Sequence, residues 1–174
     1  TILLLGFSFG RMSKTFVYDT TWHNLEKYSD SLIQQSLTIS SKNKAKVTFD
    51  EEKLKNSEAL LENQAVHFTV FSPKDQVIYP NNGVAPRITK NDWQHLRRNQ
   101  IVRKVNNKNF KLRNGKTRPA MIEVLKPYYY KKKLVAAVTV GAFISDVNSN
   151  VKRINRDLLK ALFVALIISM FVSF

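Results

Sequence analysis

The chain has 174 residues, 44% of them hydrophobic, with only five Gly and five Pro; this composition suits one ordinary globular domain and excludes collagen-like and low-complexity classes. It has no Cys, which excludes disulfides, thiol catalysis and cysteine-ligated metal sites. Its net charge of +15 is unevenly spread, because residues 87–133 hold 15 of the 28 Lys and Arg but only 2 of the 13 acidic residues.

Both ends of the chain are apolar: residues 1–10 and 161–174 carry no charge. A transmembrane helix needs about 20 apolar residues. Since each run touches an end of the chain, we expect the end of a first transmembrane helix and the start of a second. The alternatives are a cleaved signal peptide for the first run, which lacks an A-x-A-type cleavage site, and a buried core helix for the second. Arg11 and Lys14 favour a cytoplasmic domain, but this charge rule weakens for loops longer than about 60 residues.

A long helix is expected over residues 11–41, which contain neither Gly nor Pro. Apolar and small residues recur there at spacings of three and four, at Trp22, Leu25, Ser29, Leu32, Ser36 and Ile39. This heptad seam could join a second helix, or it could pack on the sheet of its own domain.

The middle of the chain, residues 42–143, is expected to form one domain. A charged loop and a short helix are predicted over residues 42–63. Apolar residues then alternate over residues 66–71, and a turn containing Pro and Asp leads to a return strand at 77–79. These residues predict a β-hairpin.

A second helix is predicted over residues 88–98, where Thr89 can cap the helix and Asp92 follows three residues later. A short strand is expected at 101–105. The polar residues 106–118 are predicted to form an exposed loop or a weak hairpin around Asn114-Gly115.

Two further strands are expected at 120–125 and 134–144. The second is apolar on both faces, which is typical of a central strand. The order of elements predicts an α+β fold with a long N-terminal helix, an antiparallel sheet of about five strands, and a C-terminal helix that enters a transmembrane segment.

The juxtamembrane helix is expected over residues 144–160. Its seam steps by three and four residues through Ile144, Val147, Val151, Ile154 and Leu158. No helix breaker separates this seam from the apolar residues 161–174. The pattern favours a rod that transmits a signal, usually within a dimer; the alternative is an amphipathic helix that caps a monomer.

Two segments carry a family resemblance: HFTVFSPKDQVIYPNNG at the first hairpin, and KLVAAVTVGAFISDVNSNVKRINRDLL at the last strand and the helix after it. With this order of elements, the chain resembles the extracytoplasmic PAS-like (Cache-type) sensor region of Gram-positive bacterial membrane histidine kinases. The resemblance implies a place in the cell membrane, with residues about 15–155 outside the cytoplasm. It also implies a HAMP linker and a kinase core after Phe174, which would bind ATP and Mg. No cofactor or phosphoacceptor His is expected within these 174 residues.

The basic residues 87–133 allow three interpretations. They could form a solvated face that rests on membrane lipid, an anion site for a small molecule or an envelope polymer, or a nucleic-acid surface, against which the apolar ends argue. In the family, ligands occupy a pocket between the sheet and the loops before its central strands, which corresponds broadly to residues 87–118. The candidate ligand-binding residues are Arg87, Trp93, His95, Arg97, Arg103, Arg118 and Tyr128.

Signals for catalysis are lacking: there is no Gly-rich phosphate loop and no H-E-x-x-H motif, and the three His share no metal-ligand spacing. We therefore expect no catalytic or metal-binding residue in this chain, while the parent protein would be a kinase. The function predicted is signal sensing for a two-component histidine kinase. The alternatives are a non-signalling membrane-anchored module that binds the cell envelope, or the sensor region of a chemoreceptor or diguanylate cyclase.

Overall fold

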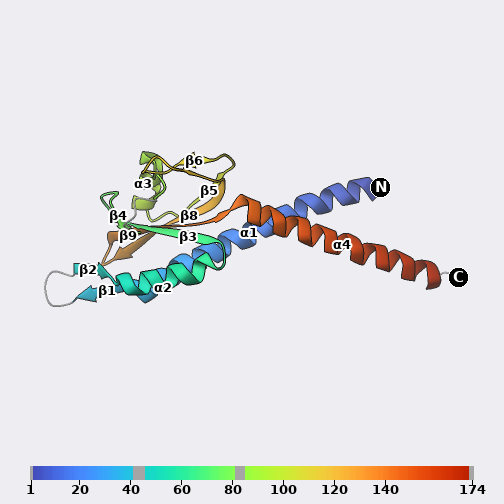
Figure 1. The fold of residues 1–174 in the computed structure, drawn as a ribbon, viewed down its shortest axis with the longest axis horizontal. Helices are drawn as coiled ribbons and strands as arrows, with labels where there is room; N and C mark the ends of the chain where they lie inside the picture. The colour runs from blue at the N-terminus through green and yellow to red at the C-terminus, as the bar shows by residue number, and fades with distance from the viewer. Residues whose placement is uncertain (1, 41–45, 81–84, 173–174) are drawn as a thin grey trace. The chain divides into compact units, whose positions relative to one another are not determined.

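The computed structural model describes residues 2–40, 46–80 and 85–172 (Figure 1). The chain divides into two compact units. One unit consists of Thr1–Thr21 together with Ser145–Phe174, and the other is Trp22–Ile144. Helix α1 (Ile2–Ser36) contributes to both.

The larger unit, Trp22–Ile144, is an α+β domain, as the order of elements predicts. After α1 it contains β1 (Leu37–Ser40), β2 (Lys46–Phe49), α2 (Glu51–Glu62), β3 (Val66–Phe71), β4 (Val77–Tyr79), α3 (Lys90–Arg97), β5 (Val102–Asn106), β6 (Phe110–Lys111), β7 (Thr117–Arg118), β8 (Met121–Tyr130) and β9 (Lys133–Phe143). The predicted hairpin at β3 and β4 and the weak hairpin around Asn114-Gly115, formed by β6 and β7, are both confirmed.

The main sheet has five antiparallel strands in the order β4-β3-β9-β8-β5, so the prediction that the last strand is central is confirmed. Strand β8 is longer than predicted and continues through Pro127 to Tyr130. Because β5 pairs with β8 only as far as Leu125, no strand of the described residues pairs with that edge of β8 beyond it, and proline is tolerated there. The turn into β9 consists of Lys131 and Lys132, both with positive φ, a conformation that sequence reasoning expects from Asn-Gly rather than from lysine.

Helix α1 ends at Ser36, so the prediction of a helix to residue 41 is wrong beyond that point. Leu37-Thr38-Ile39 instead pair with Val47-Thr48-Phe49 as strands, and the Asp50 N–H donates to the Ser36 carbonyl at 2.8 Å. β-Branched residues in both segments favour this pairing. Residues 41–45, which the predictions also cover, lie outside the described part of the chain.

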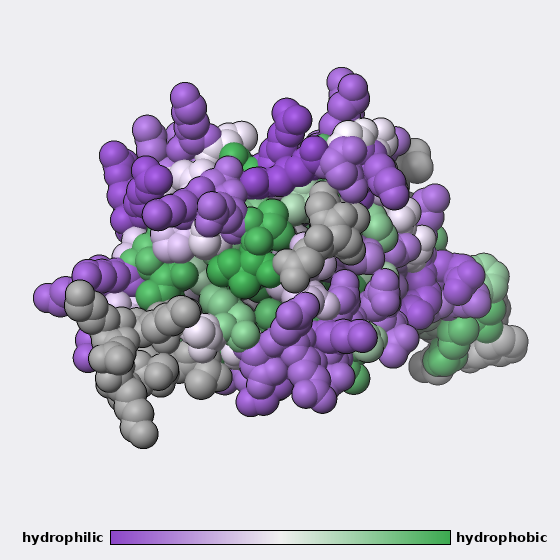
Figure 2. All heavy atoms as spheres, turned by 60° about the vertical axis from the view of Figure 1, so that its left-hand side comes forward, coloured by the Kyte–Doolittle hydropathy of each residue, from purple (hydrophilic) through white to green (hydrophobic). Residues whose placement is uncertain are grey.

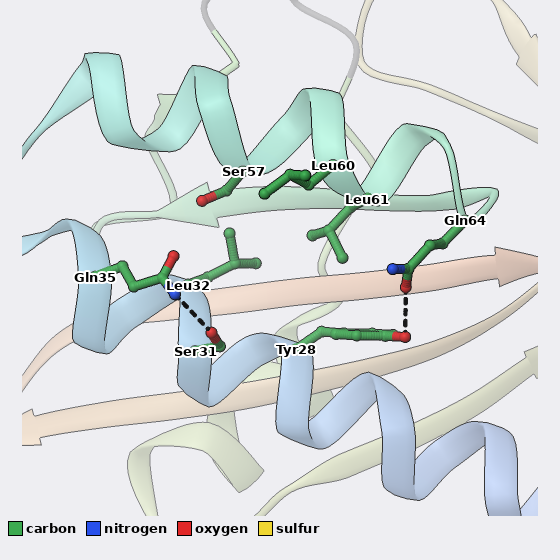
Figure 3. Close-up of a pocket in the computed structure, with 8 residues that line it drawn as sticks. All are labelled: Tyr28, Ser31, Leu32, Gln35, Ser57, Leu60, Leu61 and Gln64. Carbon is green, nitrogen blue, oxygen red and sulfur yellow. Dashed lines mark hydrogen bonds between the residues drawn. The ribbon is translucent and has the colours of Figure 1, made fainter.

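One face of the sheet is covered by α1 and α2, which lie side by side, and the opposite face by α3 (Figures 1 and 3). The α1 seam packs within its own domain, because Leu25, Ser29, Leu32 and Ser36 are buried. Ser29 Oγ lies 2.8 Å from the hydroxyl of Tyr128 on β8. These contacts account for the stripe without a second helix.

The opposite face carries an apolar cluster. Phe71, Trp93, Leu96, Leu125 and Ala137 are buried together there, with Ala85. Complete burial of a Leu, Val or Phe side chain contributes about 1.5–3 kcal/mol. Helix α3, which covers this face, begins at Lys90 because Thr89 forms the predicted capping box with Asp92.

The smaller unit contains residues 2–21 of α1 and helix α4 (Ile144–Val172). The Tyr18 hydroxyl donates to Asn148 Oδ1 at 3.5 Å, and Ser13, Val17 and Val147 are buried. Of the predicted α4 seam, Val151 and Ile154 are half-buried and Leu158 is exposed. Among the described residues, no helix is long and apolar enough to cross a membrane.

Candidate functional site

A groove runs between α1 and α2 in the larger unit (Figure 3). It has a volume of about 210 Å³, and its lining residues are Tyr28, Ser31, Leu32, Gln35, Ser57, Leu60, Leu61 and Gln64. The Tyr28 hydroxyl donates to Gln64 Oε1 at 2.5 Å, and Gln35 donates to Ser31 at 3.2 Å. The groove is therefore neutral, with leucine at its base and hydroxyl and amide groups along its sides.

A second pocket, of about 260 Å³, lies beside the turn between β3 and β4 and is lined by Asp75, Arg87, Ile88 and Arg113. Arg113 donates to the Asp75 carboxylate at 2.5 Å, to the Asp75 carbonyl at 2.9 Å and to the Pro86 carbonyl at 3.3 Å. Its guanidinium also stacks over the Phe71 ring at 5.1 Å. Because these contacts occupy Arg113, the exposed Arg87 is the cation of this pocket that can meet an anion.

A third group of polar residues lies on α3, β5, β7 and β8; Asp92 and Glu123 are buried, and the other three are half-buried. We call it the Glu123 cluster; its members are Asp92, Lys104, Asn106, Arg118 and Glu123. Glu123 is 4% exposed and accepts a hydrogen bond from Asn106 Nδ2 at 2.5 Å. Lys104 pairs with Asp92, which also accepts from the Thr89 N–H and hydroxyl.

The charges of this cluster perturb one another. Burial raises the pKa of Glu123, and Lys104 and Arg118 oppose that rise without cancelling it. Burial also lowers the pKa of Arg118, which Glu123 partly offsets. For Asp92, burial acts to raise the pKa, but hydrogen bonds from Lys104 and Thr89 outweigh burial and lower it. A buried carboxylate with a raised pKa is typical of functional sites.

The Glu123→Gln variant is expected to be more stable than the wild type at pH 7. A carboxyl whose pKa is raised in the folded state stabilises the protein fully below its ordinary pKa of 4.5, and this contribution is lost as pH rises through the folded pKa. The amide of the variant can still accept from Asn106 but does not ionise. Urea unfolding at pH 4 and pH 7 measures the difference, which should vanish at the lower pH. If Glu123→Gln is destabilised equally at both pH values, the pKa of Glu123 is not raised in the folded protein.

The structure separates the predicted ligand-binding residues. Arg103 pairs with Glu26 of α1 at 2.7 Å, and Tyr128 donates to Asp30 at 3.1 Å, so both face the α1 side of the sheet. Burial raises the pKa of Tyr128. Neither side chain reaches the pocket that holds Arg87.

The other four lie on or near the α3 side. Trp93 is a core residue, and Arg118 belongs to the Glu123 cluster. His95 is bonded to Gln100 at 2.7 Å, and the side chain of Arg97 is exposed at the end of α3. The predicted set therefore does not converge on one cavity, and its ligand-binding role stays a prediction.

Sequence reasoning did not single out Glu123, Asn106 or Arg113. One signal for Glu123 is present: it is a lone charge inside the apolar strand Met121–Leu125, at a position whose alternation points it to a covered face. Nothing comparable marks Arg113, because its partners Asp75 and Pro86 are distant in the sequence.

Comparisons with known proteins leave the family open. No protein-family model matches the chain, and no curated protein matches it. Among the described residues, no group of three or more His, Asp and Glu side chains could hold a metal ion. Any functional assignment therefore depends on the fold and on the sites described above.

Proposed function

We propose that this chain is the extracytoplasmic, PAS-like sensor region of a two-span membrane histidine kinase and acts as a dimer. The observation that carries this proposal is the junction between β9 and α4. The central strand of the sheet ends at Phe143, and α4 begins at the next residue. A shift in the sheet is thereby passed directly to the helix.

The architecture of the sheet supports the PAS-like assignment. By order along the chain, its strands lie as 2-1-5-4-3, with the first and last strands adjacent at the centre. This order is expected of a PAS-like sheet. A helix before the sheet on one face and a short helix after the first hairpin on the other agree with the same fold.

The surface of α4 supports attachment to a membrane. After Lys160 the helix carries no charged residue. Its large apolar side chains are exposed over successive turns; Leu159, Phe163, Val164, Ile167 and Ile168 are each 40–67% exposed. Such a surface is stabilised by transfer into lipid or against another apolar helix.

The mechanism we infer is a shift between two packings of the domain. A ligand, or a state of the envelope, that binds one packing more tightly favours it. The Ile144 N–H donates to the Ala120 carbonyl at 3.0 Å, which fixes the start of α4 to the start of β8. Displacement of these strands therefore moves the first turn of α4.

Val151→Asp tests this mechanism in the full-length protein in membrane vesicles. Val151 is a half-buried seam residue, so a carboxylate there should break the seam packing while the sheet stays folded. We expect autophosphorylation that no longer responds to the stimulus. Asn150→Asp is the matched control, since it places the same charge on the adjacent exposed position. A normal response from Val151→Asp would refute the rod.

The coding sequence after Phe174 separates this proposal from a non-signalling envelope-binding module. A HAMP-like helix pair followed by an H-E-x-[KR]-[ST]-P box is expected for a kinase. A stop codon or a wall-binding repeat would favour the module, and a methyl-accepting or cyclase domain would favour a chemoreceptor or diguanylate cyclase.

A further inference from the structure

We propose that five cations at one end of the main sheet form a binding surface for a linear phosphate polymer. We call them the distal cationic cluster: Arg97, Arg98, Lys131, Lys132 and Lys133. The inference rests on the proposed function only in placing the polymer outside the cell. Binding itself is independent of signalling.

Tyr129 brings the two parts of the cluster together. Its hydroxyl donates to the carbonyls of Leu96 at 3.0 Å and Arg97 at 2.8 Å. This contact ties the end of α3 to the strand that leads into the Lys131-Lys132 turn. Two segments more than 30 residues apart in the chain thus present their charges at the same end of the sheet.

The cluster differs from the other cations that are unpaired in the described part of this region, Arg87, Lys90, Lys108, Lys111 and Lys116, in joining two segments through the Tyr129 contact, and it differs from four further basic residues in lacking an acidic partner. Arg103, Lys104, Arg113 and Lys126 each have an acidic partner within 4 Å. The five residues of the cluster are all exposed, and none has an ion pair within the described ranges. Figure 2 shows hydrophilic side chains crowding the upper edge of the molecule, where Figure 1 places α3 and β6.

Lipid at the Phe143 end of β9 is a poor partner for this cluster. Lys133 begins β9, and α4 follows its other end at Phe143. Ten steps of about 3.3 Å separate these residues by about 33 Å. The potential of lipid headgroups decays over about 8 Å in physiological salt, so lipid at the Phe143 end of β9 would not attract these lysines strongly.

Nucleic acid is less favoured because, among the described residues beside the cluster, the aromatic surface for base stacking is limited to the ring of Tyr129, 36% exposed, and the half-buried Tyr130. Tyr130 lies under the Lys131 ammonium at 5.5 Å, and the Tyr129 hydroxyl is engaged with α3. Trp93, the nearest tryptophan in sequence, is buried in the core. Single-stranded nucleic acids bind largely through such stacking.

The mixture of side chains fits phosphate groups repeated along a chain. Two arginines can fork phosphate oxygens, and lysines act as point charges toward the same groups. A tetrahedral phosphate accepts hydrogen bonds from several directions, whereas one bidentate pair with a guanidinium occupies both oxygens of a planar carboxylate. A flexible polymer could therefore engage both parts of the cluster at once.

The test uses the whole 174-residue chain in detergent and fluorescently labelled inorganic polyphosphate, with anisotropy followed against salt. For five contacts, the log–log slope with salt should be about −3.5. The variant K131Q/K132Q/K133Q should bind at least tenfold more weakly, and R97Q/R98Q severalfold more weakly. The matched control K108Q/K111Q/K116Q removes equal charge from around the β6–β7 hairpin and should change affinity less than twofold. Circular dichroism checks folding.

Several results would overturn the proposal. Equal weakening by both lysine triples would indicate diffuse charge rather than a site. Tighter binding to oligo-dT of matched charge would indicate nucleic acid, and tighter binding to phosphatidylglycerol vesicles would indicate lipid. Equal affinity for polyglutamate would exclude phosphate recognition. If the lysine triple fails to fold, R97Q/R98Q decides the matter. If Val151→Asp responds normally to the stimulus while the wild type binds the polymer as expected, the signalling function alone is contradicted.

Discussion

Replacing Asp92 with alanine is expected to destabilise the larger unit by about 3 kcal/mol, from two separate losses. The first is the N-terminal cap of α3, in which Asp92 accepts from the Thr89 N–H at 2.8 Å and the Thr89 hydroxyl at 2.6 Å. The second is the partner of Lys104, whose side chain is only 25% exposed. Removing one member of a mostly buried ion pair leaves the other poorly solvated.

Two related variants divide this loss into its parts. Asp92→Asn keeps an acceptor oxygen for Thr89 and removes only the charge, whereas Thr89→Ala weakens the cap and leaves the charge beside Lys104. Each should cost about half of the effect of Asp92→Ala. Denaturant unfolding at pH 7 gives all three values. A loss below about 1 kcal/mol for Asp92→Ala would mean that neither contact stabilises the domain.

The dependence on pH gives an independent check. The pKa of Asp92 is lowered in the folded state, so its contribution is present above its ordinary value of 3.8 and is lost as pH falls through the folded pKa. The wild type should therefore lose its advantage over Asp92→Ala on acidification. An advantage that stays constant down to pH 2 would assign the effect to packing.

Local signals in the sequence predicted most of the fold of the larger unit. The capping box at Thr89, the β3–β4 hairpin and the doubly apolar β9 depend on residues close together in the chain, so periodicity and turn chemistry were sufficient. The strand at Leu37–Ser40 was missed because helical spacing continues through Ile39, and only its pairing with β2 overrides that spacing.

The candidate sites were harder to predict, since they depend on which face a side chain occupies. Arg103 and Arg118 lie in the same basic stretch, yet the first pairs with Glu26 of α1 and the second is half-buried near Glu123. The cluster at Arg97 and Lys131–Lys133 depends on the Tyr129 contact across the sheet end. The composition shows that the basic residues concentrate in residues 87–133, but it does not show which face of the domain each side chain occupies.

Gly141→Val is expected to destabilise the larger unit by about 3 kcal/mol or more, because the sheet has no room for a side chain at this position. A Cβ at Gly141 would lie 2.8 Å from Met121 Cε, 3.1 Å from Glu123 Cγ and 3.1 Å from the Ile122 carbonyl oxygen. The methionine end can move, but the backbone oxygen cannot move without disturbing β8. For a domain of this size, the loss corresponds to a fall in Tm of roughly 10–15 °C.

Gly115 provides a contrasting control. Its φ is +81° and nothing lies within 4 Å of the Cβ position, so Gly115→Ala tests backbone conformation alone. That variant should cost about 1 kcal/mol, and Gly115→Leu, which is unbranched at Cβ, little more than Gly115→Ala. At Gly141 the cost should instead increase with side-chain volume. If Gly141→Val has the same Tm as the wild type, the backbone of β8 can move to accommodate the side chain at little cost in free energy.

The close contact at Gly141 is also what links the glycine to the Glu123 cluster. Glu123 and Gly141 are direct partners across β8 and β9, and the absence of a Cβ lets the Glu123 side chain cross the centre of the sheet. Truncating Glu123 should therefore relieve part of the clash. We expect Gly141→Ala combined with Glu123→Ala to be less destabilised than the sum of the single variants, with a coupling of about 0.5–1 kcal/mol. Strict additivity would mean that Met121 and the Ile122 carbonyl alone exclude a side chain, and that Glu123 does not depend on the glycine for its buried position.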